Sequence, residues 1–243
     1  MATHIGTARK ALASIQNRHI IEWTLDAVLT AGFQNISVIS GEDVREVVGD
    51  EFWVQEFPGQ IDNAVAGVER LGEVERILFL PADTPFIHAE GLIHFVNSVE
   101  SRCEDLTSPW FAAGICPNET FRATFPDFPT PYLKLKDGDY VSGAYYAASK
   151  SGFLQGVEIF KQLSESRKSQ FKMLLKLGVL PLIRYFLHLV TIQEAETRLG
   201  KVFGGQAIVI SDCDPHAMAD IDTVEDFENV MRFAPEILSA SSS

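Results

Sequence analysis

Apolar residues in the first half of the chain recur with the spacing of helices and of strands in turn. Residues 19–31 show a broad apolar face of helical period, and Gly32 follows as a stop signal. Residues 35–40 alternate as a strand, and the four consecutive apolar residues at 77–80 indicate a short buried strand. Another short strand at 53–57 and helices near 44–48, 62–68 and 89–101 complete the pattern. This alternation predicts an α/β sheet that is mostly parallel, with right-handed crossovers.

The second half of the chain is less regular. Alternating residues at 132–136 and 140–146 flank Asp137-Gly138, which is the strongest hairpin signal in the sequence. Strands are expected at 110–116 and 207–210, with three or four helices between 152 and 199. A last helix follows Thr223 and is expected to end at Pro235. No repeat or linker divides the chain, so we expect one domain over 1–243, with a helical insertion at about 152–200.

Composition and charge narrow the class of protein. The chain has 243 residues, of which 46% are hydrophobic and 22% charged, as in ordinary soluble globular proteins. Its net charge of -13 argues against a nucleic-acid surface, although a nucleotide ligand needs only one or two cations and a metal. The three cysteines are isolated and lack C-x-x-C spacing, which favours a reducing cytoplasm over a disulfide framework or a zinc site.

No stretch has the pattern of a targeting signal or of a membrane span. The N-terminus lacks the apolar segment of a secretory signal. The most apolar region, 173–190, is interrupted by Lys176, Pro181, Arg184 and His188. We therefore expect two short amphipathic helices there, whose apolar faces line an internal or homodimer seam or, alternatively, contact a membrane surface.

Three positions carry side chains that suit phosphate chemistry. Asp83 follows the strand at 77–80, and open α/β sheets bind ligands outside the carboxyl ends of their strands. Asp220 and Asp222 precede the last helix, and Lys10 follows a loop that contains Gly6. Two converging carboxylate positions would suit Mg²⁺, and a nearby lysine would neutralise phosphate charge.

Each position also has an ordinary structural interpretation. Asp83 could make an Asx-turn or cap the helix near 89, Asp222 could cap the last helix, and Lys10 could be a surface lysine. The six histidines show no ligand spacing and are expected to be structural or on the surface, with His4 left open. No G-x-S-x-G elbow, P-loop or complete G-x-G-x-x-G is present, which gives no support to a serine hydrolase, a P-loop kinase or a dinucleotide dehydrogenase.

In this order and spacing, four short segments resemble those of the MobA-like nucleotidyltransferase family. The sequence Gly-Thr-Ala-Arg-Lys-Ala-Leu at 6–12 is similar to the end of the family's signature loop, and 60–67 is similar to the segment that faces the base. The sequence Ala-Asp-Thr-Pro at 82–85 resembles the metal-binding Asp-x-Pro element, and Asp-Ile-Asp-Thr at 220–223 resembles the second metal element. The resemblance covers most of the chain, from about residue 6 to 230, and implies a three-layer Rossmann-like fold shared with GT-A sugar transferases.

The resemblance also implies an activity. It is that of a Mg²⁺-dependent nucleotidyltransferase, which transfers a nucleoside monophosphate from an NTP to a small-molecule acceptor and releases pyrophosphate. The site residues that it implies are Lys10 and Asp83 in catalysis, Gly6, Thr7, Arg9, Asp62 and Asn63 in nucleotide binding, and Asp83, Asp220 and Asp222 at the metal.

Two departures from the family pattern leave alternatives open. The buried first strand is missing, and Ala-Thr-His at 2–4 stands where the family has Ala-Gly-Gly, whose glycines let backbone amides approach phosphates. Ser-Gly-Ala at 142–144 stands where the family often has Gly-Gly-Asn. A catalytically impaired homologue that binds a nucleotide or a partner is therefore the alternative. A GT-A glycosyltransferase is a third, although Asp-x-Asp at 220–222 lies at the wrong end of the chain for it.

Overall fold

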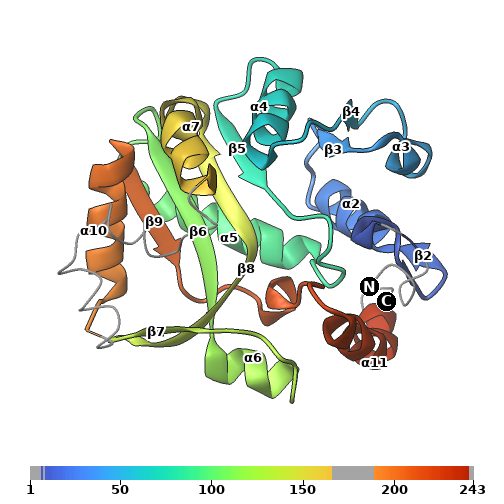
Figure 1. The fold of residues 1–243 in the computed structure, drawn as a ribbon. Coiled ribbons are helices and arrows are strands. Elements are labelled where there is room, and N and C mark those ends of the chain that lie inside the picture. The colour runs from blue at the N-terminus through green and yellow to red at the C-terminus, as the bar shows by residue number, and fades with distance from the viewer. Residues whose placement is uncertain (1–6, 8, 166–188, 241–243) are drawn as a thin grey trace.

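The computed structural model describes residues 7, 9–165 and 189–240, and its centre is a mixed sheet. The strands lie in the order β5-β8-β6-β9, with β7 added to β8 (Figure 1). Strand β8 runs antiparallel to β5, β6 and β7, whereas β6 and β9 are parallel. The strands are β5 (Arg76–Phe79), β6 (Trp110–Pro117), β7 (Leu133–Leu135), β8 (Gly138–Ser149) and β9 (Gln206–Ile210).

Alternation along β8 separates the two faces of this sheet, because successive side chains of a strand point to opposite sides. Tyr145 points to the face that α5 (Ala89–Arg102) covers, and its ring stacks on Phe95 with centroids 5.2 Å apart. Tyr146 points to the other face, beside its register partner Phe79 of β5. There Phe79 packs on Phe153 of α7 (Lys150–Glu165) with centroids 5.1 Å apart. Helices on both faces confirm the three-layer α/β prediction.

The first third of the chain forms a separate parallel pair of strands, β3 (Val38–Ser40) and β4 (Trp53–Gln55). A small apolar core with Val44 and Val48 at its centre joins these strands to the helices around them. Among the described residues no strand joins this pair to β5, so the two sheets stay separate (Figure 1). The helices of this region are α2 (Ile20–Thr30), α3 (Glu42–Val48) and α4 (Gln60–Leu71).

The remaining elements are a short hairpin and several helices. The short strands β1 (Ser14–Ile15) and β2 (Arg18–His19) pair as a small hairpin. Of the predicted insertion at about 152–200, the described part contains nearly all of α7 and most of α10 (Ile192–Phe203). Residues 166–188 lie outside the described residues, and with them most of the predicted seam at 173–190. None of the described helices is both long and apolar enough to cross a membrane. The others are η1 (Lys10–Leu12), α6 (Asn118–Thr124), η3 (Pro215–Met218) and α11 (Val224–Ala240).

One prediction about α11 was wrong, and one of the alternatives left open for Asp222 is excluded. Pro235 lies inside the helix rather than at its end. Proline removes the hydrogen bond to the carbonyl four residues earlier, but Met231 is 43% exposed, so water can reach that side of the helix. Asp222 is not the cap, because Oγ1 of Thr223 accepts the N–H of Asp226 at 3.2 Å and Oδ2 of Asp226 accepts the N–H of Thr223 at 2.7 Å. This reciprocal pair is a capping box, and it leaves the Asp222 side chain available for other contacts.

Replacing Asp226 with alanine is expected to lower the free energy of unfolding by about 2 kcal/mol and the melting temperature by roughly 4–8 °C. The carboxylate is 5% exposed and also accepts hydrogen bonds from the N–H of Asp222 and the hydroxyl of Thr223, so three donors lose their partner. Thermal unfolding of Asp226→Ala beside Glu225→Ala, an exposed acid on the same turn, checks this. Equal melting temperatures for the two variants would contradict it.

Candidate functional site

Lys10 joins two loops that lie far apart in the sequence. Its Nζ lies 2.6 Å from Oδ1 of Asp222 and 3.2 Å from Oδ2 of Asp83. The N–H of Ile221 donates to the carbonyl of Asp83 at 3.2 Å, which ties the same two loops through their backbones. Asp83 does not cap α5, since His88 is the N-cap and its side chain accepts the N–H of Gly91. The structure therefore brings together three of the residues that the sequence analysis selected, just beyond the carboxyl end of β5.

Asp220 completes a cluster of three carboxylates. Burial raises the pKa of Asp220 to about 6, and the negative charges of Asp222 and Asp83 add to the rise. Mutual repulsion of this kind is relieved when a cation lies among the carboxylates. Lys10 supplies one positive charge, and its contacts with Asp222 and Asp83 raise its pKa although partial burial opposes this. Oxygen donors suit a hard divalent cation such as Mg²⁺ by their chemistry. Among the described residues, however, the ligand atoms of these three aspartates do not all lie within 4.8 Å of one another, so the side chains would have to move closer together to share one ion.

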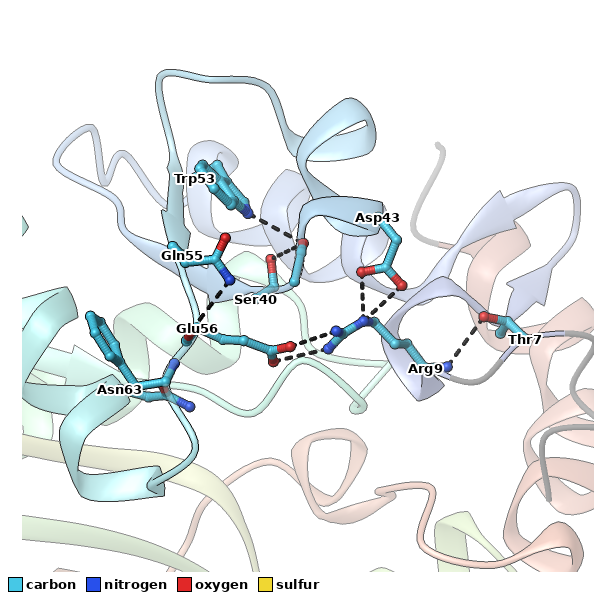
Figure 2. A network of polar contacts seen from close by, with 10 residues as sticks. Thr7, Arg9, Ser40, Asp43, Trp53, Gln55, Glu56 and Asn63 are labelled. Atoms are coloured by element: carbon cyan, nitrogen blue, oxygen red, sulfur yellow. Dashed lines mark hydrogen bonds and ion pairs between the residues drawn. The ribbon is translucent and has the colours of Figure 1, made fainter.

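Arg9 is held by two carboxylates, one in the first turn of α3 and one directly after β4 (Figure 2). Its guanidinium forms hydrogen bonds of 2.5 and 2.9 Å with the two oxygens of Glu56, and its Nε donates to Asp43 at 2.7 Å. The hydrogen bond with Glu56 and the contacts with Asp43 raise the pKa of Arg9 against the effect of burial. The backbone N–H of Arg9 donates to the hydroxyl of Thr7 at 3.2 Å. Arg9 thus ties the segment before Lys10 to the smaller sheet.

The remaining residues selected from the sequence lie at the start of α4 or outside the described part. Asp62 and Asn63 are in the first turn of α4, and Oδ1 of Asn63 accepts the N–H of Phe57 at 2.5 Å. This bond holds the loop between β4 and α4 and fixes the direction of the Asn63 amide (Figure 2). Gly6 lies outside the described residues.

The Ser-Gly-Ala segment of β8 is set by packing. A Cβ on Gly143 would lie 2.5 Å from the carbonyl oxygen of Ala217 and 2.7 Å from Cα of Met218, so only glycine fits against η3. Ala144 is 1% exposed and lies in the main core. Its side chain therefore has no access to a ligand, and a polar residue there would need a buried partner.

An apolar cavity of about 330 Å³ lies on the α7 face of the sheet. Tyr146 lines this cavity and is half-exposed. Partial burial raises the pKa of its hydroxyl, and the negative charge of Asp220 adds to the rise. At Tyr146 the cavity lies within electrostatic range of Asp220. Other lining residues come from α4, α7, α10 and the sheet, and include Ile61, Ala64, Phe153, Leu199, Phe203 and Phe111.

The sequence analysis missed one cluster of polar side chains. His88 and His216, both expected to be structural or on the surface, lie on either side of Asp214. Although burial opposes it, contacts with the two imidazoles lower the pKa of Asp214. The only local signal was the Asp-x-His spacing of 214 and 216, because His88 comes from a distant loop.

Comparison with known proteins places these features in a family. The model of the MobA-like NTP transferase domain matches residues 1–133. A solved structure described as a hypothetical transferase from Thermus thermophilus is 23% identical, with a TM-score of 0.81 over 93% of each chain. No curated protein sequence matches the chain.

Two further solved structures share the fold at lower similarity. The 4-diphosphocytidyl-2C-methyl-D-erythritol synthase of Anaerococcus prevotii is 14% identical, with a TM-score of 0.58 over 95% of this chain and 90% of its own. A CMP:2-keto-3-deoxy-manno-octonic acid synthetase in complex with CTP is 16% identical, with a TM-score of 0.57 over 98% of this chain and 96% of its own.

The match to the family model agrees with the fold and with the convergence of Lys10, Asp83 and Asp222 at one edge of the sheet. It also spans more than half of the 243 residues. The chain therefore belongs to the MobA-like NTP transferase family and is a nucleotidyltransferase.

Proposed function

We propose that this protein transfers a nucleoside monophosphate from an NTP to a small acceptor, in a Mg²⁺-dependent reaction that releases pyrophosphate. The observation that supports this most strongly is the convergence of Lys10 with Asp83 and Asp222, together with the half-buried Asp220. Such a site needs no nucleophilic side chain, because phosphoryl and nucleotidyl transfer depend on positioning and on electrostatic stabilisation.

In this proposal Asp83, Asp220 and Asp222 hold the cation. Bound Mg²⁺ would supply positive charge to the triphosphate and to the pyrophosphate that leaves. Lys10 pairs with the carboxylates in the nucleotide-free chain, and its ammonium is proposed to contact the phosphates when the cation takes its place. The acceptor oxygen forms a bond to the α-phosphorus as the bond to the bridging oxygen breaks, and pyrophosphate departs on the opposite side.

The acceptor is proposed to lie beside Tyr146, where the apolar cavity opens near Asp220. Asp62 and Asn63 at the start of α4 are proposed to face the base, and Thr7 and Arg9 to lie near the phosphates. The structural neighbour in complex with CTP makes a pyrimidine nucleotide the first substrate to test.

Screening the four NTPs by thermal shift in the presence of Mg²⁺ tests the proposed substrate class. A ligand that binds the native state stabilises it by about 2.7 kcal/mol at a hundred times its dissociation constant. We expect one NTP to raise the melting temperature more than the others, and chelation of the metal to abolish the rise. A flat response to all four NTPs would contradict the proposal.

Arg9 provides a separate prediction, because a triphosphate would compete with Glu56 for its guanidinium. Glu56→Gln is expected to tighten NTP binding by about two- to tenfold, and Arg9→Ala is expected to weaken it. Both variants should stay folded, because an exposed ion pair contributes no more than about 1 kcal/mol to stability. Calorimetric titration with the preferred NTP measures both. If both variants weaken binding, Arg9 acts only by holding its loop through Glu56.

The alternative is a homologue that binds a nucleotide or a partner without catalysis. Its support is that no described strand joins the smaller sheet to β5. Nucleotide binding without release of pyrophosphate, over a broad set of alcohol and phosphate acceptors, would favour this alternative.

A further inference from the structure

We propose a second metal site, for a first-row transition metal ion such as Zn²⁺, formed by His88, Asp214 and His216. One ligand atom from each residue lies within 4.8 Å of the others. His88 is the N-cap of α5, Asp214 is the N-cap of η3, and His216 lies in η3. This set differs in chemistry from the carboxylate cluster of the proposed Mg²⁺ site, which contains no imidazole.

The contacts around Asp214 suit a shared cation. Nε2 of His88 lies 2.7 Å from Oδ2 of Asp214, and Nδ1 of His216 lies 2.8 Å from Oδ1. Oδ2 is nevertheless buried without a hydrogen-bond partner, so the short distance to His88 is not accompanied by hydrogen-bond geometry. Ligands of a tetrahedral Zn²⁺ lie roughly 3.3 Å apart, so a small outward movement of the two imidazoles makes room for the ion.

The surroundings of His88 and His216 support this arrangement. In this structure Nδ1 of His88 accepts the N–H of Gly91 at 3.3 Å. A metal ion on Nε2 would require Nδ1 to carry the proton instead and to donate it to a carboxylate, for which Oε2 of Glu90 lies 3.4 Å away. The ring of His216 is held edge-on to Phe125, with centroids 5.6 Å apart. Each imidazole thus has a neighbour that fixes its orientation.

Gly91 lets the first turn of α5 approach the cluster closely. A Cβ on this residue would lie 2.6 Å from the hydroxyl of Tyr145 and 2.9 Å from Oδ2 of Asp214. The hydroxyl of Tyr145 is a buried oxygen with no hydrogen-bond partner, and Oδ2 of Asp214 meets His88 without hydrogen-bond geometry, so an ion or a water bound to it beside them would satisfy both oxygens.

The donor set determines the class of metal. Two imidazoles and one carboxylate favour Zn²⁺ and its neighbours in the first transition row, whereas Mg²⁺ prefers oxygen ligands only. Three protein ligands leave a fourth position for water, as in zinc sites that are not purely structural. The loops that carry His88 and Asp214 continue into those that carry Asp83 and Asp220, so a bound ion would also hold the proposed Mg²⁺ ligands in place.

The test is a calorimetric titration of Zn²⁺ into the full chain, stripped of metal and kept in excess Mg²⁺. We expect one equivalent to bind, and His88→Asn and His216→Asn each to weaken binding by at least about tenfold. Asparagine at 88 keeps a side-chain acceptor for the N–H of Gly91, so α5 keeps its cap. His94→Asn is the control, since His94 is exposed and lies 3.5 Å from Asp212.

Replacing Zn²⁺ by Co²⁺ gives a second readout, because the visible absorption of Co²⁺ reports the coordination of the bound ion. Unchanged Zn²⁺ affinity in both histidine variants, or no binding by the unmodified chain, would overturn the proposal and leave a hydrogen-bonded ion-pair cluster. Asp83→Asn must retain Zn²⁺ binding. If it does not, the ion binds at the carboxylates and the second site is refuted, whatever the outcome for nucleotidyl transfer.

Discussion

Asp83→Asn is expected to lower the rate of nucleotidyl transfer by about 10²- to 10³-fold, with little change in the folded structure. The side chain of Asp83 contacts Lys10 at the carboxyl end of β5, where the proposed cation and triphosphate meet. Asparagine has nearly the same shape but no charge, so the site loses a metal ligand and keeps its volume. Pyrophosphate release with the preferred NTP measures the loss.

Asp139→Asn is the matched control, because Asp139 is an exposed aspartate on the β7–β8 hairpin. It should keep full activity. Thermal unfolding should show that both variants are folded, since Lys10 keeps its contact with Asp222 when Asp83 is neutral. Equal rates in Asp83→Asn and the unmodified chain would remove Asp83 from the proposed site.

Lys10→Met is expected to change metal binding and catalysis in opposite directions. The ammonium group competes with Mg²⁺ for Asp83 and Asp222, so its removal should tighten Mg²⁺ binding to the nucleotide-free chain. The same variant lacks the positive charge proposed to stabilise the phosphates, which should lower turnover by about a hundredfold.

The two halves of this prediction are measured separately, by Mg²⁺ titration without nucleotide and by steady-state kinetics with it. Lys201→Met, at an exposed lysine of α10, is the control for loss of charge and should change neither quantity. Weaker Mg²⁺ binding in Lys10→Met would contradict the proposed competition. Unchanged turnover would mean that Lys10 only neutralises the aspartates.

Local sequence patterns predicted the elements whose structure depends mainly on their own residues. Strand β5 follows from its run of apolar residues, and the β7–β8 hairpin follows from Asp137-Gly138, since Gly138 adopts a φ of 145° that favours glycine. The end of α11 could not be predicted in this way. Pro235 is tolerated because water can reach that side of the helix, and the local sequence does not encode which side faces water.

In the candidate site, too, some features follow from local sequence and others only from the fold. Local sequence left Asp83 and Asp222 open between capping and ligand binding. The observed caps, His88 and Thr223, exclude helix capping in both cases, and ligand binding stays a prediction. The contact of Lys10 with Asp222 spans 212 residues, so only the family resemblance indicated it in advance. No resemblance pointed to His88 and Asp214, and their proximity follows only from the fold.

The central claim is that Lys10 and the three aspartates form a Mg²⁺–NTP site. Its most direct test is calorimetric titration of the preferred NTP into the unmodified chain, with Mg²⁺ and after its removal. The account predicts binding with Mg²⁺ that is at least about tenfold weaker without it, and the same weakening in Asp83→Asn with Mg²⁺ present. NTP binding that is equally tight without the metal, or no binding of any of the four NTPs, would contradict it.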